Sequence, residues 1–221
     1  MARLFVAGLA VALWGCGSSS NTQRTKITVE VETPSGMRSG YSVVEDVMTP
    51  AGALSISDNK YSSTFRGEAV AVDLPSGRTL FALLHNGHSF DMPNLIGRAL
   101  YPEGRKEGEP ALEPGHPPRE MRAQIRGLTE PGLPLLVTFG DINDPKSVVR
   151  VDPDNLAATF GAGVRLRRIT VAVTNEPVTV RIEEQLGWLP NIYNMGLGPD
   201  FKPEGIPLGN FKGLFTTETP E

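Results

Sequence analysis

The segment of residues 64–84 constrains the fold more than any other, because it has the pattern of a β-hairpin. From Val70 to Leu74, every second residue is a larger apolar one, which is the period of a strand with one buried face. A Pro-Ser-Gly turn at residues 75–77 follows, and the return run of residues 79–84 is almost wholly apolar. We therefore expect the return strand to lie inside a sheet that is covered on both faces.

Other strand patterns indicate that this sheet is mainly antiparallel. Residues 26–32 alternate apolar and polar side chains, a second Pro-Ser-Gly turn follows, and residues 40–48 return as its partner strand. Three further strands are expected at residues 133–139, 148–151 and 164–174, the last of them central.

About three short helices are expected between and after these strands. One follows Pro93, and a second begins at Asp152 with Pro153 in its first turn and ends at Gly161. Two segments fit either a helix or a strand: we favour a helix for residues 177–186 and leave residues 119–128 open. The predicted fold is α+β, strand-rich, with a mainly antiparallel sheet built from hairpins; a β-sandwich is the alternative.

The chain has 221 residues, of which 39% are hydrophobic, which is enough for one sizeable core. We expect a single strand-rich domain over residues 26–186, interrupted by a mobile loop at residues 102–118 that is too rich in Pro, Gly and charge to pack. Residues 187–221 form a Gly/Pro-rich segment, expected to be extended and pinned along the domain by aromatic rings, namely Trp188, Tyr193, Phe201, Phe211 and Phe215.

The N-terminus has the features of an export signal. Arg3 precedes an apolar run, residues 4–14, that is too short to span a bilayer as a permanent helix. The sequence Leu-Trp-Gly-Cys that ends at Cys16, the only cysteine, resembles the lipobox of bacterial lipoproteins. This resemblance implies a signal peptide over residues 1–15, lipid attachment at Cys16 and a flexible tether over residues 16–25.

The lipobox also predicts where the protein resides. Lipid on Cys16 would anchor an exported protein to a membrane, which is the first partner we expect. In enteric bacteria, an aspartate directly after the lipid-bearing cysteine resembles a mark for retention in the inner membrane. This chain has Gly17 at that position instead. The expected location is therefore the periplasmic side of the outer membrane.

Candidate chemistry is sparse. His85, His88 and Asp91 follow a predicted strand in a polar loop, a place where metal ligands or catalytic groups can lie. No catalytic motif and no cofactor-binding fingerprint is present, so we predict no catalytic residue and no cofactor. A net charge of −4 without a basic patch does not favour nucleic-acid binding.

Three sequence blocks together with the lipobox resemble a family of uncharacterised exported proteins or lipoproteins of alphaproteobacteria. The blocks are residues 27–36, 67–84 and 150–174. The resemblance implies no activity and no functional residue. We therefore predict a non-catalytic cell-envelope lipoprotein that binds or scaffolds a protein or glycan partner. The alternative is a periplasmic metal-binding protein or hydrolase that uses residues 85–91.

Overall fold

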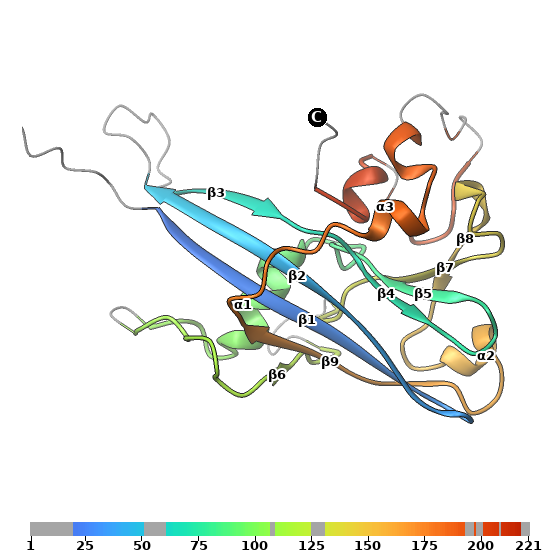
Figure 1. The fold of residues 1–221 in the computed structure, drawn as a ribbon, viewed down its shortest axis with the longest axis horizontal. Helices are drawn as coiled ribbons and strands as arrows, with labels where there is room; N and C mark the ends of the chain where they lie inside the picture. The colour runs from blue at the N-terminus through green and yellow to red at the C-terminus, as the bar shows by residue number, and fades with distance from the viewer. Residues whose placement is uncertain are drawn as a thin grey trace, which may run out of the picture.

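The computed structural model describes residues 20–50, 61–106, 109–124, 131–192, 197, 201–207 and 209–217. Within these residues the chain forms two antiparallel sheets with short helices around them (Figure 1), which confirms the predicted α+β, strand-rich class. The strands are β1 (Asn21–Thr33), β2 (Gly36–Pro50), β3 (Tyr61–Arg66), β4 (Val70–Asp73), β5 (Thr79–Ala82), β6 (Arg119–Glu120), β7 (Leu136–Phe139), β8 (Val148–Val151) and β9 (Arg165–Val173). The helices are α1 (Met92–Leu100), α2 (Leu156–Phe160) and α3 (Ile182–Gln185), with the 3-10 helices η1 (Pro145–Ser147), η2 (Leu189–Asn191) and η3 (Lys212–Leu214).

The first sheet has the strand order β3-β2-β1-β9-β6 and is built on the long β1–β2 hairpin. The predicted alternation is confirmed in β1, where Ile27, Val29 and Val31 are all fully buried. The strand begins earlier than expected, at Asn21, because residues 21–25 pair with the end of β2. The predicted tether is therefore wrong for residues 21–25, while Cys16 and residues 1–15 lie outside the described residues.

The second sheet has the order β4-β5-β7-β8 and contains the hairpin predicted from the sequence. Val70 pairs with Ala82 and Asp73 with Thr79, and β5 lies between β4 and β7 as expected of the apolar return strand. The first residues of the predicted hairpin segment, 64–66, do not belong to the hairpin, because they are part of β3 in the first sheet. The chain passes from one sheet to the other at Gly67, whose φ of 157° is one that glycine tolerates.

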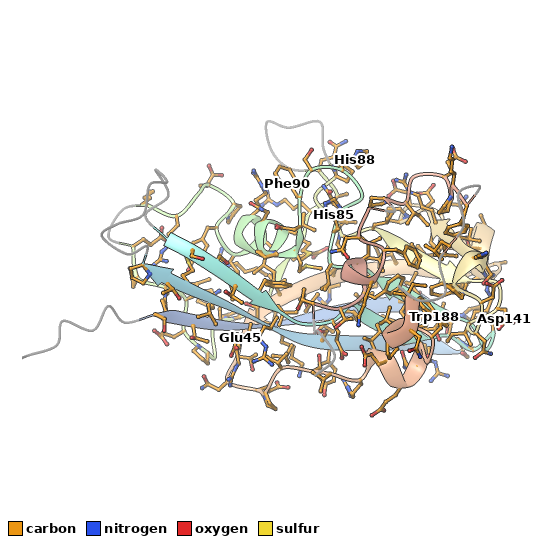
Figure 2. The ribbon with its side chains drawn as sticks, turned by 90° about the horizontal axis from the view of Figure 1, so that it is seen from above. Glu45, His85, His88, Phe90, Asp141 and Trp188 are labelled. Carbon is orange, nitrogen blue, oxygen red and sulfur yellow. The ribbon has the colours of Figure 1, made fainter. Side chains whose placement is uncertain are left out.

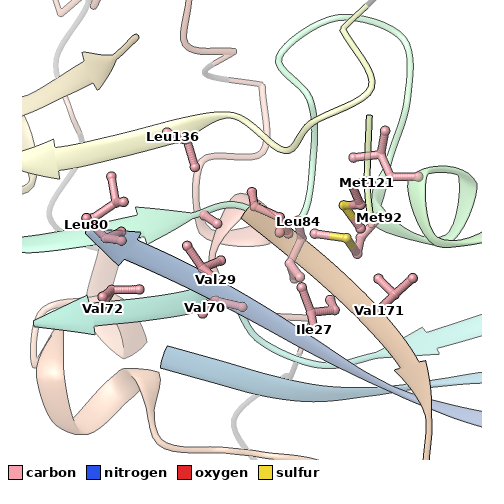
Figure 3. Packing of buried hydrophobic residues seen from close by; sticks show 14 of the residues in the cluster. Ile27, Val29, Val70, Val72, Leu80, Leu84, Met92, Met121, Leu136 and Val171 are labelled. Carbon is pink, nitrogen blue, oxygen red and sulfur yellow. The ribbon is translucent and has the colours of Figure 1, made fainter. Parts of the chain in front are cut away.

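The main core lies between the two sheets and beneath α1 (Figure 3). Ile27 and Val29 of the first sheet pack in one cluster with Val70 and Leu80 of the second. Helix α1 buries Met92 in the same cluster, and Asp91 caps its N-terminus by accepting a hydrogen bond from the Asn94 backbone N–H at 3.3 Å. Two sheets packed face to face account for the sandwich character considered as an alternative.

A second core covers the opposite face of the second sheet. Phe81 and Phe139 of the sheet are in edge-to-face contact, with ring centroids 5.6 Å apart, and Phe215 lies 6.1 Å from Phe81. The predicted packing of C-terminal rings is confirmed for Trp188, Phe201, Phe211 and Phe215, whereas Tyr193 lies outside the described residues. The segment is coiled into turns and 3-10 helices where we expected an extended chain.

Two helices begin later than predicted. Asp152 forms a turn by accepting a hydrogen bond from the Asp154 backbone N–H, so α2 begins at Leu156 under the side-chain cap of Asn155. Residues 177–181 are not helical, because the Thr179 backbone pairs with β2, and α3 covers only Ile182–Gln185. Residues 119–128, left open above, supply the short strand β6, while residues 125–130 lie outside the description.

The chain between β9 and α3 crosses the outer face of the first sheet (Figure 1, orange). Lys26 of β1 is ion-paired with Glu176 at 2.9 Å. Beyond it, Thr179 lies at the edge of β2 beside Val43, where β3 no longer pairs with β2. The Thr179 N–H donates a hydrogen bond to the Val43 carbonyl oxygen at 3.1 Å, and Thr179 Oγ1 accepts one from the Val43 N–H at 3.1 Å. This crossing delivers the C-terminal segment to the second core.

Candidate binding groove beside α1

The structure places two of the predicted metal ligands, His85 and Asp91, opposite each other in an isolated antiparallel bridge, but it does not group all three side chains. His85 is half-buried and its Nδ1 accepts a hydrogen bond from the Gly87 backbone N–H at 2.9 Å, while His88 is exposed (Figure 2). Asp91 is occupied at the N-terminus of α1, where its Oδ1 also accepts from Asn94 Nδ2 at 2.7 Å. Across the described part of the chain, no three His, Cys, Asp or Glu side chains are grouped as a metal site would require.

Asn86, which sequence reasoning missed, organises this loop. It is 2% exposed, and its Oδ1 accepts hydrogen bonds from the backbone N–H groups of His88 at 2.8 Å and Phe90 at 3.1 Å. Its Nδ2 donates to the carbonyl oxygen of Pro131 at 3.0 Å. The loop is therefore a structural connection between β5 and α1, held by one buried amide.

A groove of about 1000 Å³ lies beside α1. Its walls come from the exposed side of α1, from the chain that follows this helix, and from β6 with the residues just after it. The described lining residues are Pro93, Asn94, Leu95, Gly97, Arg98, Ala99, Tyr101, Pro102, Gly104, Arg105, Arg119, Glu120, Met121, Arg122, Ala123, Gln124 and Gly132. Volumes of this order are typical of ligand sites.

The segments that form the groove are positioned by contacts that are distant in sequence. Helix α1 is held by its buried face, including Leu95 and Leu100, in the main core. Strand β6 pairs with β9, Arg119 facing Val171, and the Met121 N–H donates to the Ile169 carbonyl oxygen at 2.8 Å. The lining is therefore carried on the sheet and on a packed helix.

The segment predicted as a mobile loop contributes one wall. Its described residues, 102–106 and 109–118, contain no helix or strand. Contrary to the expectation that this segment would not pack, Leu112 lies against the main core and its N–H donates to the Tyr101 hydroxyl oxygen at 3.0 Å. This hydrogen bond holds the Tyr101 side chain in the lining of the groove.

The described lining carries a marked excess of positive charge. Four arginines face one carboxylate, that of Glu120. The charge of Glu120 also acts on Arg168 of β9: the pKa of Arg168 is raised mainly by its hydrogen bond to Glu30, and to a smaller extent by the Glu120 carboxylate. Glu120 therefore offsets only part of the positive charge of the described lining.

Two of the four arginines are held in place by neutral groups. Arg98 lies over the Phe90 ring at 4.5 Å, and Arg105 donates from Nε and Nη2 to the Glu109 carbonyl oxygen at 3.1 and 2.8 Å. The Nε atom of Arg119 is buried and has no hydrogen-bond acceptor. Within the part of the chain that the structure covers, none of the four forms an ion pair with a carboxylate. The groove can therefore accept negative charge.

Comparison with family models, with curated proteins and with solved structures gave no match. The family resemblance stated above thus stays a prediction. Among the described residues, no helix has both the length and the hydrophobicity needed to cross a bilayer.

Proposed function

We propose that this protein is a non-catalytic binding protein of the cell envelope and that the groove beside α1 is its ligand site. The observation that carries the proposal is the lining itself, which among the described residues has four arginines against one glutamate in a space of about 1000 Å³. Arginine side chains supply several hydrogen-bond donors in a fixed geometry, and the apolar residues between them supply contact area. This combination favours recognition of a ligand over chemistry on it.

The proposed setting is the membrane surface, with Cys16 as the point of lipid attachment. Cys16 and Asn21 are five residues apart, and an extended chain spans at most about 3.6 Å per residue, so the start of β1 would lie within about 18 Å of the bilayer. The chain that follows α1 lies at the end of the molecule where β1 begins (Figures 1 and 2). An anchored protein would thus hold the groove near the periplasmic face of the outer membrane.

In-cell photo-crosslinking tests this function. A benzophenone amino acid placed at Ala123, an exposed residue of the groove wall, should capture a discrete adduct in living cells. The matched control is the same probe at Ser39, exposed near the tip of the β1–β2 hairpin. Adducts at Ala123 with none at Ser39 support the proposal; equal capture at both positions, or none at Ala123, contradicts it.

A further inference from the structure

We infer that the groove recognises a phosphate ester, and that Arg119 makes the central contact to the phosphate group. The inference rests on the function proposed above and specifies its ligand class. It begins with the Nε–H of Arg119, which is buried without an acceptor. A buried donor without a partner is destabilising, and native structures keep few of them, so an acceptor from outside the chain is expected to complete this one.

The position of Arg119 suits such a contact. Its backbone is fixed in β6 opposite Val171, so the side chain starts from a rigid element. The Nε–H and a neighbouring Nη–H of a guanidinium group point in parallel and bind two oxygens of one phosphate or carboxylate group. The Nε–H is closed to solvent in the unbound protein, so the guanidinium group must turn toward the groove to bind an oxyanion, which would then satisfy the Nε–H and gain a second hydrogen bond from Nη.

The number of arginines favours phosphate over carboxylate. Arg98, Arg105 and Arg122 share the lining with Arg119, and Glu120 is the only acidic residue among the described lining residues. The excess of about three positive charges among the described lining residues is better matched by a phosphate monoester, which carries close to two negative charges at neutral pH, than by a single carboxylate. Arg98 and Arg105 are already placed by neighbouring groups, which lowers the entropy lost on binding.

The remaining lining indicates that the phosphate is attached to a larger, partly apolar body. Tyr101, Met121 and Pro102 contribute apolar surface beside the arginines. Arg105 lies over the Tyr101 ring at 5.8 Å, so a charged and an apolar surface meet there. A phosphate ester with an apolar or ring-shaped substituent fits both surfaces. Such an ester could be a soluble phosphomonoester or the headgroup of a phospholipid that ends in a phosphomonoester, because both carry close to two negative charges.

Calorimetric titration of the full-length protein in a non-ionic detergent tests the inference. The probes are phenyl phosphate, as a soluble monoester, and dihexanoylphosphatidic acid, as an anionic lipid that is also a monoester, with dihexanoylphosphatidylcholine, a diester, as the net-neutral lipid control. We expect saturable binding of phenyl phosphate, of the anionic lipid, or of both. Binding of the first alone assigns a soluble ester, and preference for the anionic lipid over the net-neutral one assigns a headgroup.

Substitutions locate the contact. Arg119→Gln and, at an exposed position of the same groove, Arg122→Gln should each raise the Kd of the bound probe about tenfold, whereas Arg38→Gln, exposed near the hairpin tip, should change it less than twofold. If the Arg119→Gln variant is destabilised, its Kd is not interpretable. The Arg122→Gln variant, whose thermal unfolding should be unchanged, then gives the comparison with Arg38→Gln.

The inference is overturned if no probe binds, or if the Arg38→Gln variant loses as much affinity as the groove variants. A crosslink at Ala123 without any phosphate binding would refute the phosphate assignment and leave the binding function standing. Absence of that crosslink would instead refute the binding function itself.

Discussion

At the scale of single residues, Gly40 sets how closely the two sheets approach. It lies in β2 opposite Val29 of β1, and a Cβ atom added to it would clash with the backbone carbonyl of Ala71, next to the second sheet's Val72. A backbone group cannot move aside as a flexible side chain can. The main core therefore depends on the absence of a side chain at this position.

Gly40→Ala should lower the free energy of unfolding by about 2–3 kcal/mol, because the sheets must separate to admit the methyl group. Gly97→Ala is the matched control: Gly97 lies inside α1, nothing lies within 4 Å of an added Cβ, and the change should raise stability by up to about 1 kcal/mol. Urea denaturation measures both. Equal effects of the two substitutions would contradict the packing described here.

Asn86 provides a second test at this scale. Replacing Asn86 by Ala removes acceptors for the backbone N–H groups of His88 and Phe90 and a donor to Pro131, and should cost about 1–3 kcal/mol. Asn143→Ala, which removes an exposed amide, should cost less than about 0.5 kcal/mol. Chemical denaturation of the two variants measures both free energies of unfolding. A loss of stability no larger for Asn86→Ala than for Asn143→Ala would show that other contacts hold the loop.

At the scale of elements, Glu68 connects the two sheets to the C-terminal segment. It is 4% exposed, and its Oε2 accepts hydrogen bonds from the backbone N–H groups of Arg181 at 2.6 Å and Ile182 at 2.7 Å, at the start of α3. Its own carbonyl oxygen accepts from Ser42 Oγ at 2.8 Å. One buried carboxylate thus caps a helix that otherwise has no side-chain cap.

Glu68→Ala should speed amide exchange in residues 182–192, because α3 loses the acceptor at its first turn, and should lower stability by about 2 kcal/mol or more. Glu68→Gln keeps an acceptor oxygen and should lose less. Hydrogen exchange with mass spectrometry follows the segment directly. Exchange at the parent rate in both variants would mean that the aromatic rings alone hold it.

The same scale shows what could be predicted from sequence. Both hairpins were predictable, because alternation and a Pro-Ser-Gly turn are local signals. The start of α3 was not, because residues 177–181 are held by pairing of Thr179 with Val43, more than 130 residues away in the chain. The crossing of the chain from the first sheet to the second at Gly67 could not be predicted for the same reason. The alternation of apolar residues indicates a strand, but it does not indicate which sheet the strand joins.

The groove was out of reach of sequence reasoning. Its walls, α1 and residues 119–124, are brought together by the main core and by the β6–β9 pairing, which are not visible in the sequence. Of its four arginines in the described lining, only Arg105 lies in the segment whose composition indicates a loop, and the other three belong to the expected helix after Pro93 and to residues 119–128. The histidine spacing, by contrast, is visible in the sequence, but the backbone of the loop directs His85 and Asp91 to separate local hydrogen bonds.

At the scale of the whole molecule, the second sheet is a layer between two cores. Leu80 and Ala82 of β5 face the main core, while Phe81 and Leu83 face the second one. The C-terminal segment supplies the outer half of the second core, so it belongs to the fold and is more than an appendage of the predicted domain.

Phe215→Ala should therefore lower the free energy of unfolding by about 3–5 kcal/mol, because this ring is fully buried against Phe81, Phe139 and Trp188. Met37→Ala, at an apolar residue that is 51% exposed, should have an effect below about 0.5 kcal/mol. Thermal and urea unfolding report both values. A small loss for Phe215 would mean that the segment is not part of the cooperative unit.

We propose above all that the groove beside α1 is where this protein binds its ligand. Hydrogen exchange of the full-length protein, compared between native envelope vesicles and the purified state, tests this most directly. We predict slower exchange in the vesicles for peptides that cover residues 92–106 and 119–124, with no change around residues 36–44 of β2. Protection confined to β2, or identical exchange of all peptides in the two states, would contradict the claim.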